Sequence, residues 1–127
     1  MKINHFALYT NNLEKLKHFY EKYFDAVSNE MYYNEKTGLK TYFLTFEDGC
    51  KLELMYSPKI VETNKTGYEK GFIHLAFSTG SKSKVDELTR QIENDGYSIL
   101  SAPRTTGDGY YESCISDPDG NQIEITE

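Results

Sequence analysis

The sequence predicts an α+β fold made of two βαβββ modules, whose curved mixed or antiparallel sheets surround a shared cavity. Two short patterns carry this prediction, because each occurs twice and in the same order. The first pattern is His5-Phe6-Ala7-Leu8-Tyr9-Thr10, which returns as His74-Leu75-Ala76-Phe77-Ser78-Thr79. The second is Asp48-Gly49-Cys50-Lys51-Leu52-Glu53-Leu54, which returns as Asp119-Gly120-Asn121-Gln122-Ile123-Glu124-Ile125. Each half therefore offers one histidine and one glutamate in matched positions.

Length and composition narrow the function classes. The 127 residues suffice for one ordinary domain, and we expect a single domain made of module 1–57, connection 58–70 and module 71–127. With 14 Lys and Arg against 20 Asp and Glu, the net charge is -6. This charge favours a small-molecule partner and argues against nucleic acid and anionic membranes. No apolar stretch predicts a membrane span or a signal peptide, so a cytoplasmic location is expected.

The first module begins with a strand and a helix. Residues 2–10 alternate between two faces, as is typical of a strand. Asn11 and Glu14 have the spacing of a capping box at the start of a helix. The helix is supported by apolar residues at helical intervals, namely Leu13, Leu16, Tyr20, Tyr23 and Phe24. An antiparallel meander should follow, with turns at 34–38 and 48–49 and strands at Val27–Tyr33, Thr41–Glu47 and Lys51–Tyr56.

The second module repeats this plan after a polar, Gly- and Pro-punctuated connection. A strand is expected at Phe72–Ser78 and a helix at Ser81–Asp95, capped at Ser83 and closed by Gly96. The remaining strands are expected at Tyr97–Leu100, Tyr110–Ser116 and Gln122–Thr126.

Strand alternation places the four repeated His and Glu side chains on the face of each sheet that the helix does not cover. Leu52 and Leu54 should pack under the helix while Glu53 points away, and Ile123 and Ile125 are separated from Glu124 in the same way. A lone strand His, or a Glu between two apolar residues, is more often structural, but the repeat favours a joint metal site. Two imidazoles and two carboxylates suit divalent Zn, Ni, Co, Mn or Fe. Such an ion would polarise a substrate oxygen, and a glutamate would serve as base.

These residues also resemble a known family. The paired βαβββ plan, the four candidate ligands and the run Asp117-Pro118-Asp119-Gly120-Asn121-Gln122-Ile123-Glu124 are similar to the vicinal oxygen chelate superfamily. Within it, the chain most resembles the glyoxalase I-like proteins, the lactoylglutathione lyases. Asn12-Leu13-Glu14 leading to Phe19-Tyr20 is a further family mark. The resemblance covers essentially the whole chain and implies the glyoxalase/bleomycin resistance/dioxygenase fold.

The resemblance implies a site and a reaction. One divalent metal ion would be held by His5, Glu53, His74 and Glu124, and the protein would form a homodimer. The reaction would isomerise the hemithioacetal of methylglyoxal and a thiol cosubstrate to a hydroxyacyl thioester, through a metal-bound enediolate. Glu124 or Glu53 would be the base. Glu53 favours this reading over fosfomycin-resistance transferases and extradiol dioxygenases, which typically use two His and one Glu.

Three further residues are candidates for contact with the substrate. Tyr9 stands where the resemblance leads us to expect an Arg that binds the glutathione carboxylate. Arg104, in the expected loop 102–110, is an alternative anion-binding residue, although a plain hairpin with a solvated Arg explains it equally. Cys114 lies near the cavity or is a small buried residue. With Cys50 it lacks Cys-x-x-Cys spacing, so neither a disulfide framework nor a thiolate zinc site is indicated.

Two other functions remain open from the sequence. A bleomycin-resistance-like protein would bind a small molecule in an acidic, aromatic-lined cleft without catalysis, which the net charge and the 11 Tyr residues allow. The same fold also supports other metal reactions, such as those of an epimerase, a dioxygenase or a thiol transferase. The complete set of four matched ligands favours the glyoxalase reaction over both.

Overall fold

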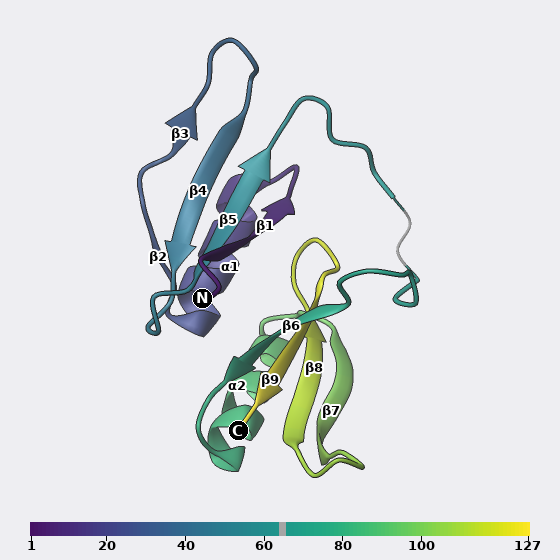
Figure 1. Ribbon diagram of the computed structural model, residues 1–127. Helices are drawn as coiled ribbons and strands as arrows, with labels where there is room; N and C mark the ends of the chain where they lie inside the picture. Colours follow the sequence, from purple (N-terminus) through teal and green to yellow (C-terminus); the bar gives the residue numbers. More distant parts are fainter. Residues whose placement is uncertain (64–65) are drawn as a thin grey trace. The chain divides into compact units, whose positions relative to one another are not determined.

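The computed structural model describes residues 1–63 and 66–127, which form two compact units, Met1–Thr63 and Asn64–Glu127 (Figure 1). Each unit contains one helix and one mixed sheet, so the α+β class and the repeated plan are confirmed. The predicted connection 58–70 includes residues 64–65, which lie outside the described residues. The predicted domain boundaries and the shared cavity stay predictions. No helix in the described part of the chain combines the length and the apolar character that a membrane span requires.

The first unit places its histidine strand beside its glutamate strand. The sheet has the order β1-β5-β4-β2, with β3 paired to β4, and β1 runs parallel to β5. Its elements are β1 (His5–Tyr9), α1 (Leu13–Phe24), β2 (Val27–Ser28), β3 (Tyr32–Tyr33), β4 (Lys40–Thr45) and β5 (Lys51–Tyr56). The predicted apolar stripe of α1 is buried and packs on β4 and β5, where Leu44, Leu52 and Leu54 are at most 1% exposed.

The prediction of a single strand at Val27–Tyr33 is wrong, because the structure has two short strands there, β2 and β3. One residue more lies between Ser28 and Tyr32 than between their partners on β4, so the ladder is interrupted. Asn29 occupies the interruption, where its side-chain oxygen accepts the backbone N–H of Phe43 at 2.7 Å. A side chain that can replace a backbone acceptor in this way makes the break possible.

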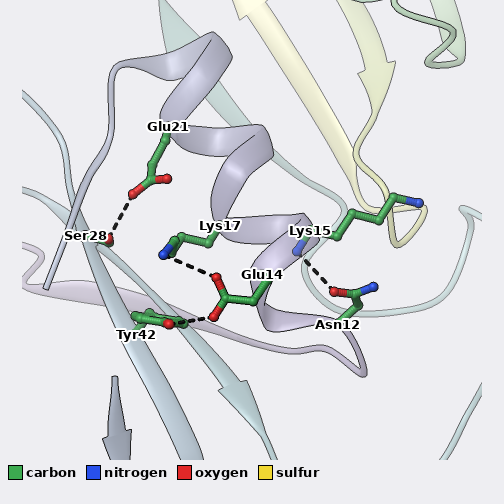
Figure 2. Close-up of polar contacts among 7 residues, drawn as sticks. All are labelled: Asn12, Glu14, Lys15, Lys17, Glu21, Ser28 and Tyr42. Carbon is green, nitrogen blue, oxygen red and sulfur yellow. Dashed lines mark hydrogen bonds and ion pairs between the residues drawn. The ribbon is translucent and has the colours of Figure 1, made fainter. Parts of the chain in front are cut away.

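Helix α1 begins one residue later than the capping box predicts. Its N-cap is Asn12, whose side-chain oxygen accepts from the backbone N–H of Lys15 at 3.1 Å. Glu14 accepts the hydroxyl hydrogen of Tyr42 at 2.5 Å and forms an ion pair with Lys17 at 3.3 Å (Figure 2). The Glu14 carboxylate, which the sequence pattern predicted to cap the helix, therefore links α1 to β4 through Tyr42.

Replacing Tyr42 by Phe should lower the free energy of unfolding by about 1 kcal/mol near neutral pH, because the Glu14 carboxylate loses its donor. The Tyr42 hydroxyl, helped by Lys17, holds the pKa of Glu14 below its ordinary value of 4.5. Ionised Glu14 therefore stabilises the fold above that pH, and the contribution is lost as the pH falls through the lowered pKa. Denaturant unfolding at neutral and acid pH should show the cost of Tyr42→Phe shrinking under acid. Equal costs at both pH values, or an undiminished cost in a Glu14→Gln background, would contradict this.

The second unit repeats the arrangement with a clean parallel pair. Its sheet has the order β6-β9-β8-β7, with β6 parallel to β9. The elements are β6 (His74–Ser78), α2 (Lys82–Asn94), β7 (Ile99–Thr105), β8 (Tyr111–Ser116) and β9 (Gln122–Thr126). Helix α2 is capped by Ser81, whose hydroxyl accepts from Lys84 N–H, and not by Ser83 as predicted. It covers Ile115, Ile123 and Ile125, which are fully buried.

Strand β7 differs most from the sequence prediction. It extends from Ile99 to Thr105, so Arg104 lies in a strand opposite Glu112 and not in a loop. The register shifts on both sides of Ser101, which marks bulges. Pro103 cannot donate a ladder hydrogen bond and is tolerated because β7 is the edge of the sheet. The expected loop is thereby reduced to the hairpin turn at 106–110.

Candidate metal centre

The first His–Glu pair consists of His5 on β1 and Glu53 on β5. Glu53 faces Ala7 in the parallel register, so His5, two residues before Ala7 on the same face of β1, is its diagonal neighbour. The two side chains approach to 3.9 Å between Nε2 and Oε2, with 42% and 16% of their surfaces exposed. The His5 ring also packs edge-on against Phe43, with centroids 5.7 Å apart.

A contact with Asn4 orients the His5 ring. Its Nδ1 lies 2.8 Å from the side-chain oxygen of Asn4. Because an amide oxygen only accepts hydrogen bonds, the neutral ring carries its proton on Nδ1. The lone pair is then on Nε2, the atom that faces Glu53. A hydrogen bond of this kind fixes the orientation of many metal-ligating imidazoles.

The second His–Glu pair, His74 on β6 and Glu124 on β9, has the same relation. Glu124 faces Ala76 in the register, and His74 is again diagonal to it. Here Nε2 and Oε2 are 3.2 Å apart, and 33% and 22% of the side chains are exposed. The two halves that repeat in sequence therefore also repeat the diagonal arrangement of one His and one Glu. Both pairs project from the sheet face opposite the buried residues Leu52, Leu54, Ile123 and Ile125, as alternation predicts.

The spacing of each pair can be compared with metal coordination. Two ligands bound at about 2.1 Å with tetrahedral or octahedral angles are about 3.0–3.4 Å apart. The second His–Glu pair falls in this range, and the first is wider by about half an ångström. Across residues 1–63 and 66–127, no three His, Cys, Asp or Glu side chains gather. Each unit therefore supplies two donors of the chemistry that a divalent ion accepts, and the joint site of four ligands stays a prediction.

Charges around Glu124 tune its acidity. Burial raises the pKa of Glu124, and the nearby carboxylates of Glu112 and Asp108 add to the rise, whereas His74 and Arg104 oppose it. A raised pKa makes a carboxylate a better proton acceptor near neutral pH.

The predicted substrate residues fall on the same faces as the pairs. Tyr9 shares the face of His5 and is 61% exposed. Arg104 lies on the face of Glu124 in the second unit, because the bulges of β7 change the direction of its side chain. Its Nη1 donates to Ser101 Oγ at 2.7 Å. Cys114 lies directly opposite Glu124 and is only partly buried, so its reading as a small buried residue is wrong. Burial raises the pKa of the Cys114 thiol.

Sequence reasoning missed three polar neighbours of the second His–Glu pair: Ser101, Glu112 and Gln122. The register places Gln122 beside His74, Glu112 beside Thr126 and Ser101 beside Cys114. Alternation along Tyr111–Ser116 would have placed Glu112 on the face of Cys114. Pro103 was the signal for an irregular edge strand. The irregularity places Ser101 among the polar neighbours of the second His–Glu pair.

Comparison with known proteins identifies the family. The model of the Glyoxalase/Bleomycin resistance protein/Dioxygenase superfamily matches residues 2–125. The chain therefore belongs to this superfamily, whose fold is shared by enzymes such as glyoxalase I.

Individual relatives are distant. The uncharacterized protein YqjT of Bacillus subtilis (strain 168) is 26% identical over 127 residues, covering 97% of this chain and 96% of that protein. A structure described as a possible glyoxalase from Bacillus cereus has a TM-score of 0.74 at 24% identity, covering 100% of this chain and 99% of that one. Glyoxalase I from Zea mays has a TM-score of 0.80 at 21% identity, covering 98% of this chain and 44% of that one. At these identities the two structures show the fold alone.

Proposed function

We propose that the protein is a metal-dependent lyase or isomerase of the glyoxalase I type. Its substrate would be the hemithioacetal of methylglyoxal and a thiol, or a similar small oxygenated compound, and its product a hydroxyacyl thioester. The observation that carries the proposal is the recurrence of the same diagonal His–Glu pair on the helix-free face of both units. Membership of a superfamily with glyoxalase I neighbours supports it.

The donor set fits one divalent ion. His5, Glu53, His74 and Glu124 would hold it, either within one chain or between the chains of a homodimer, and the two carboxylates would offset its charge. When bound, the ion supplies Lewis-acid polarisation of the substrate oxygens. Nitrogen and oxygen donors of this kind accept Zn, Ni, Co, Mn or Fe.

The proton transfer falls to a glutamate of this chain. Glu124 or Glu53 removes the proton from the carbon that carries the hydroxyl and sulfur, leaving an enediolate. The same proton is then returned to the neighbouring carbon and the hydroxyl proton passes to the other oxygen, so the carbonyl and hydroxyl exchange places and no redox partner is consumed. In the metal-free protein the pKa of Glu124 is raised, which favours proton uptake by this carboxylate when it is not bound to the ion.

The assay is direct. Metal-free protein is reconstituted with each candidate ion and given methylglyoxal with glutathione and with other thiols, and thioester formation is followed. We expect turnover with at least one ion and thiol. A flat trace with every combination would overturn the proposed reaction and leave the family assignment intact.

Arg104 should recognise an anionic group of the thiol part of the substrate. One of its five N–H donors is used by Ser101, which holds the guanidinium on the face of Glu124. Replacing Arg104 by Gln should raise KM about tenfold for the hemithioacetal of mercaptopropionate, because a charge-assisted hydrogen bond is lost. KM for the neutral mercaptoethanol adduct should not change. Equal effects on both substrates would remove this role.

A second candidate function is binding of a small aromatic molecule without catalysis. The register aligns Tyr9, Met55, Thr41 and Tyr32 in one row on the face of His5; both tyrosines are more than half exposed, whereas Thr41 is buried. An exposed tyrosine ring of this kind would stack on a planar ligand. Tight binding of an aromatic ligand by metal-free protein, with no turnover under any condition, would favour this function over the enzyme.

A further inference from the structure

A short turn at residues 66–69 lies within the predicted connection 58–70 and belongs to the second unit. The Glu69 carboxylate accepts three hydrogen bonds, from the backbone N–H of Thr66 at 2.6 Å, from its hydroxyl at 2.7 Å and from the N–H of Gly67 at 3.0 Å. These donors, with the Thr66 backbone first, lower the pKa of Glu69 to about 2. We call residues 66–69 the Glu69 turn; its carboxylate stays ionised under all ordinary conditions.

The Glu69 turn lies against the side chain of Gln122. Gly67 has a φ of +87°, and a Cβ added there would stand 2.8 Å from Gln122 Nε2. A real Cβ does not stand that close to another atom, so a side chain at position 67 would push the amide end of Gln122 aside. Gly67 thus leaves room for the Gln122 amide on one side.

Gln122 connects this turn to the second His–Glu pair. It is paired with His74 on β6 and Ser116 on β8, and it shares its face with Glu124 two positions along β9. Its Oε1 lies 4.0 Å from the Cys114 sulfur, whose thiol has a second acceptor in the Ile115 carbonyl oxygen at 3.9 Å. The amide therefore lies between Gly67 and Cys114, beside His74 in the register and on the same face as Glu124.

We propose that the Glu69 turn and Gln122 form one wall of the site, and that Gln122 is a specificity-determining residue positioned by Gly67. The amide offers N–H donors and a carbonyl acceptor, so it fits a hydroxyl or carbonyl oxygen of the substrate beside the reacting carbon. The turn limits the size of the group that enters on this side. This inference rests on the proposed function for its substrate, but the contact itself can be tested without turnover.

The first test reads the position of the amide through Cys114. In a Cys50→Ser background, the rate of iodoacetamide alkylation reports on Cys114 alone. Gly67→Ala should displace the amide and raise this rate about threefold, as loss of one hydrogen bond implies. Gln122→Ala should raise it similarly, and the double variant should show no further increase. The control is Gly80→Ala, which has a similar φ of +79° and no atom within 4 Å of its added Cβ, and should leave the rate unchanged.

The second test uses the hemithioacetal assay. Gln122→Ala should raise KM for the small substrate about fivefold with little change in kcat, while Gln122→Asn restores part of the loss. Gly80→Ala should behave as wild type. If neither the wild type nor any variant converts the substrate, the proposed function fails, and the alkylation rates still test the contact between Gly67 and Gln122. Unchanged alkylation in both Gly67→Ala and Gln122→Ala, or unchanged KM in an active Gln122→Ala enzyme, would overturn the inference.

Discussion

Replacing Glu124 by Gln should reduce kcat at least about 100-fold, the usual contribution of a positioned acid or base. The substitution replaces a charged metal donor by a weaker, neutral amide oxygen and removes the favoured proton acceptor. It should change the free energy of unfolding by less than about 1 kcal/mol, because the side chain lies on the helix-free face and is not part of the buried core. Steady-state kinetics at saturating metal and denaturant unfolding measure the two effects separately.

Glu112→Gln is the matched control for this substitution. Glu112 lies on the same face of the same sheet and contributes to the raised pKa of Glu124, but it is not a candidate ligand. Its replacement makes the same change of charge and should reduce kcat by less than about tenfold. Similar losses in the two variants would assign the effect to the local charge and not to the chemistry of Glu124.

Replacing either His5 or His74 by Ala should weaken metal binding more than about 100-fold, because losing a direct ligand costs more than losing one of its supporting partners. The effect should be similar for both, since the two pairs repeat the same geometry. Competition with a chromophoric chelator measures the affinity. His18→Ala is the control, because this exposed histidine lies on α1. Wild-type affinity in either ligand variant would exclude that histidine from the site.

The repeated pattern predicted the parts of the fold that depend on strand alternation. His5, Glu53, His74 and Glu124 face away from the helices because their neighbours Leu52, Leu54, Ile123 and Ile125 are driven into the core. Burial of apolar area sets this choice, and a shift of one residue would expose the whole apolar set. The diagonal approach within each pair follows from the parallel registers of β1 with β5 and β6 with β9.

The sequence predictions of element boundaries are wrong where side chains from distant parts of the chain decide the local hydrogen bonds. Asn11 and Asn12 are equally good caps by residue type, and the choice of Asn12 goes with Glu14 being drawn to Tyr42, a partner distant in the sequence. The break between β2 and β3 depends on the bond from Phe43 to Asn29. The bulges of β7 are set by pairing with β8 around Pro103. None of these partners follows from local periodicity.

The account depends on the two His–Glu pairs acting on one ion. Equilibrium dialysis of metal-free protein against Ni or Co, followed by metal analysis, gives the number of ions bound per chain. We expect one ion per chain in the wild type, and none at the same concentration in either His5→Ala/Glu53→Gln or His74→Ala/Glu124→Gln. Two ions per chain, or one ion retained in each double variant, would show that the pairs bind metal separately and would contradict the shared site.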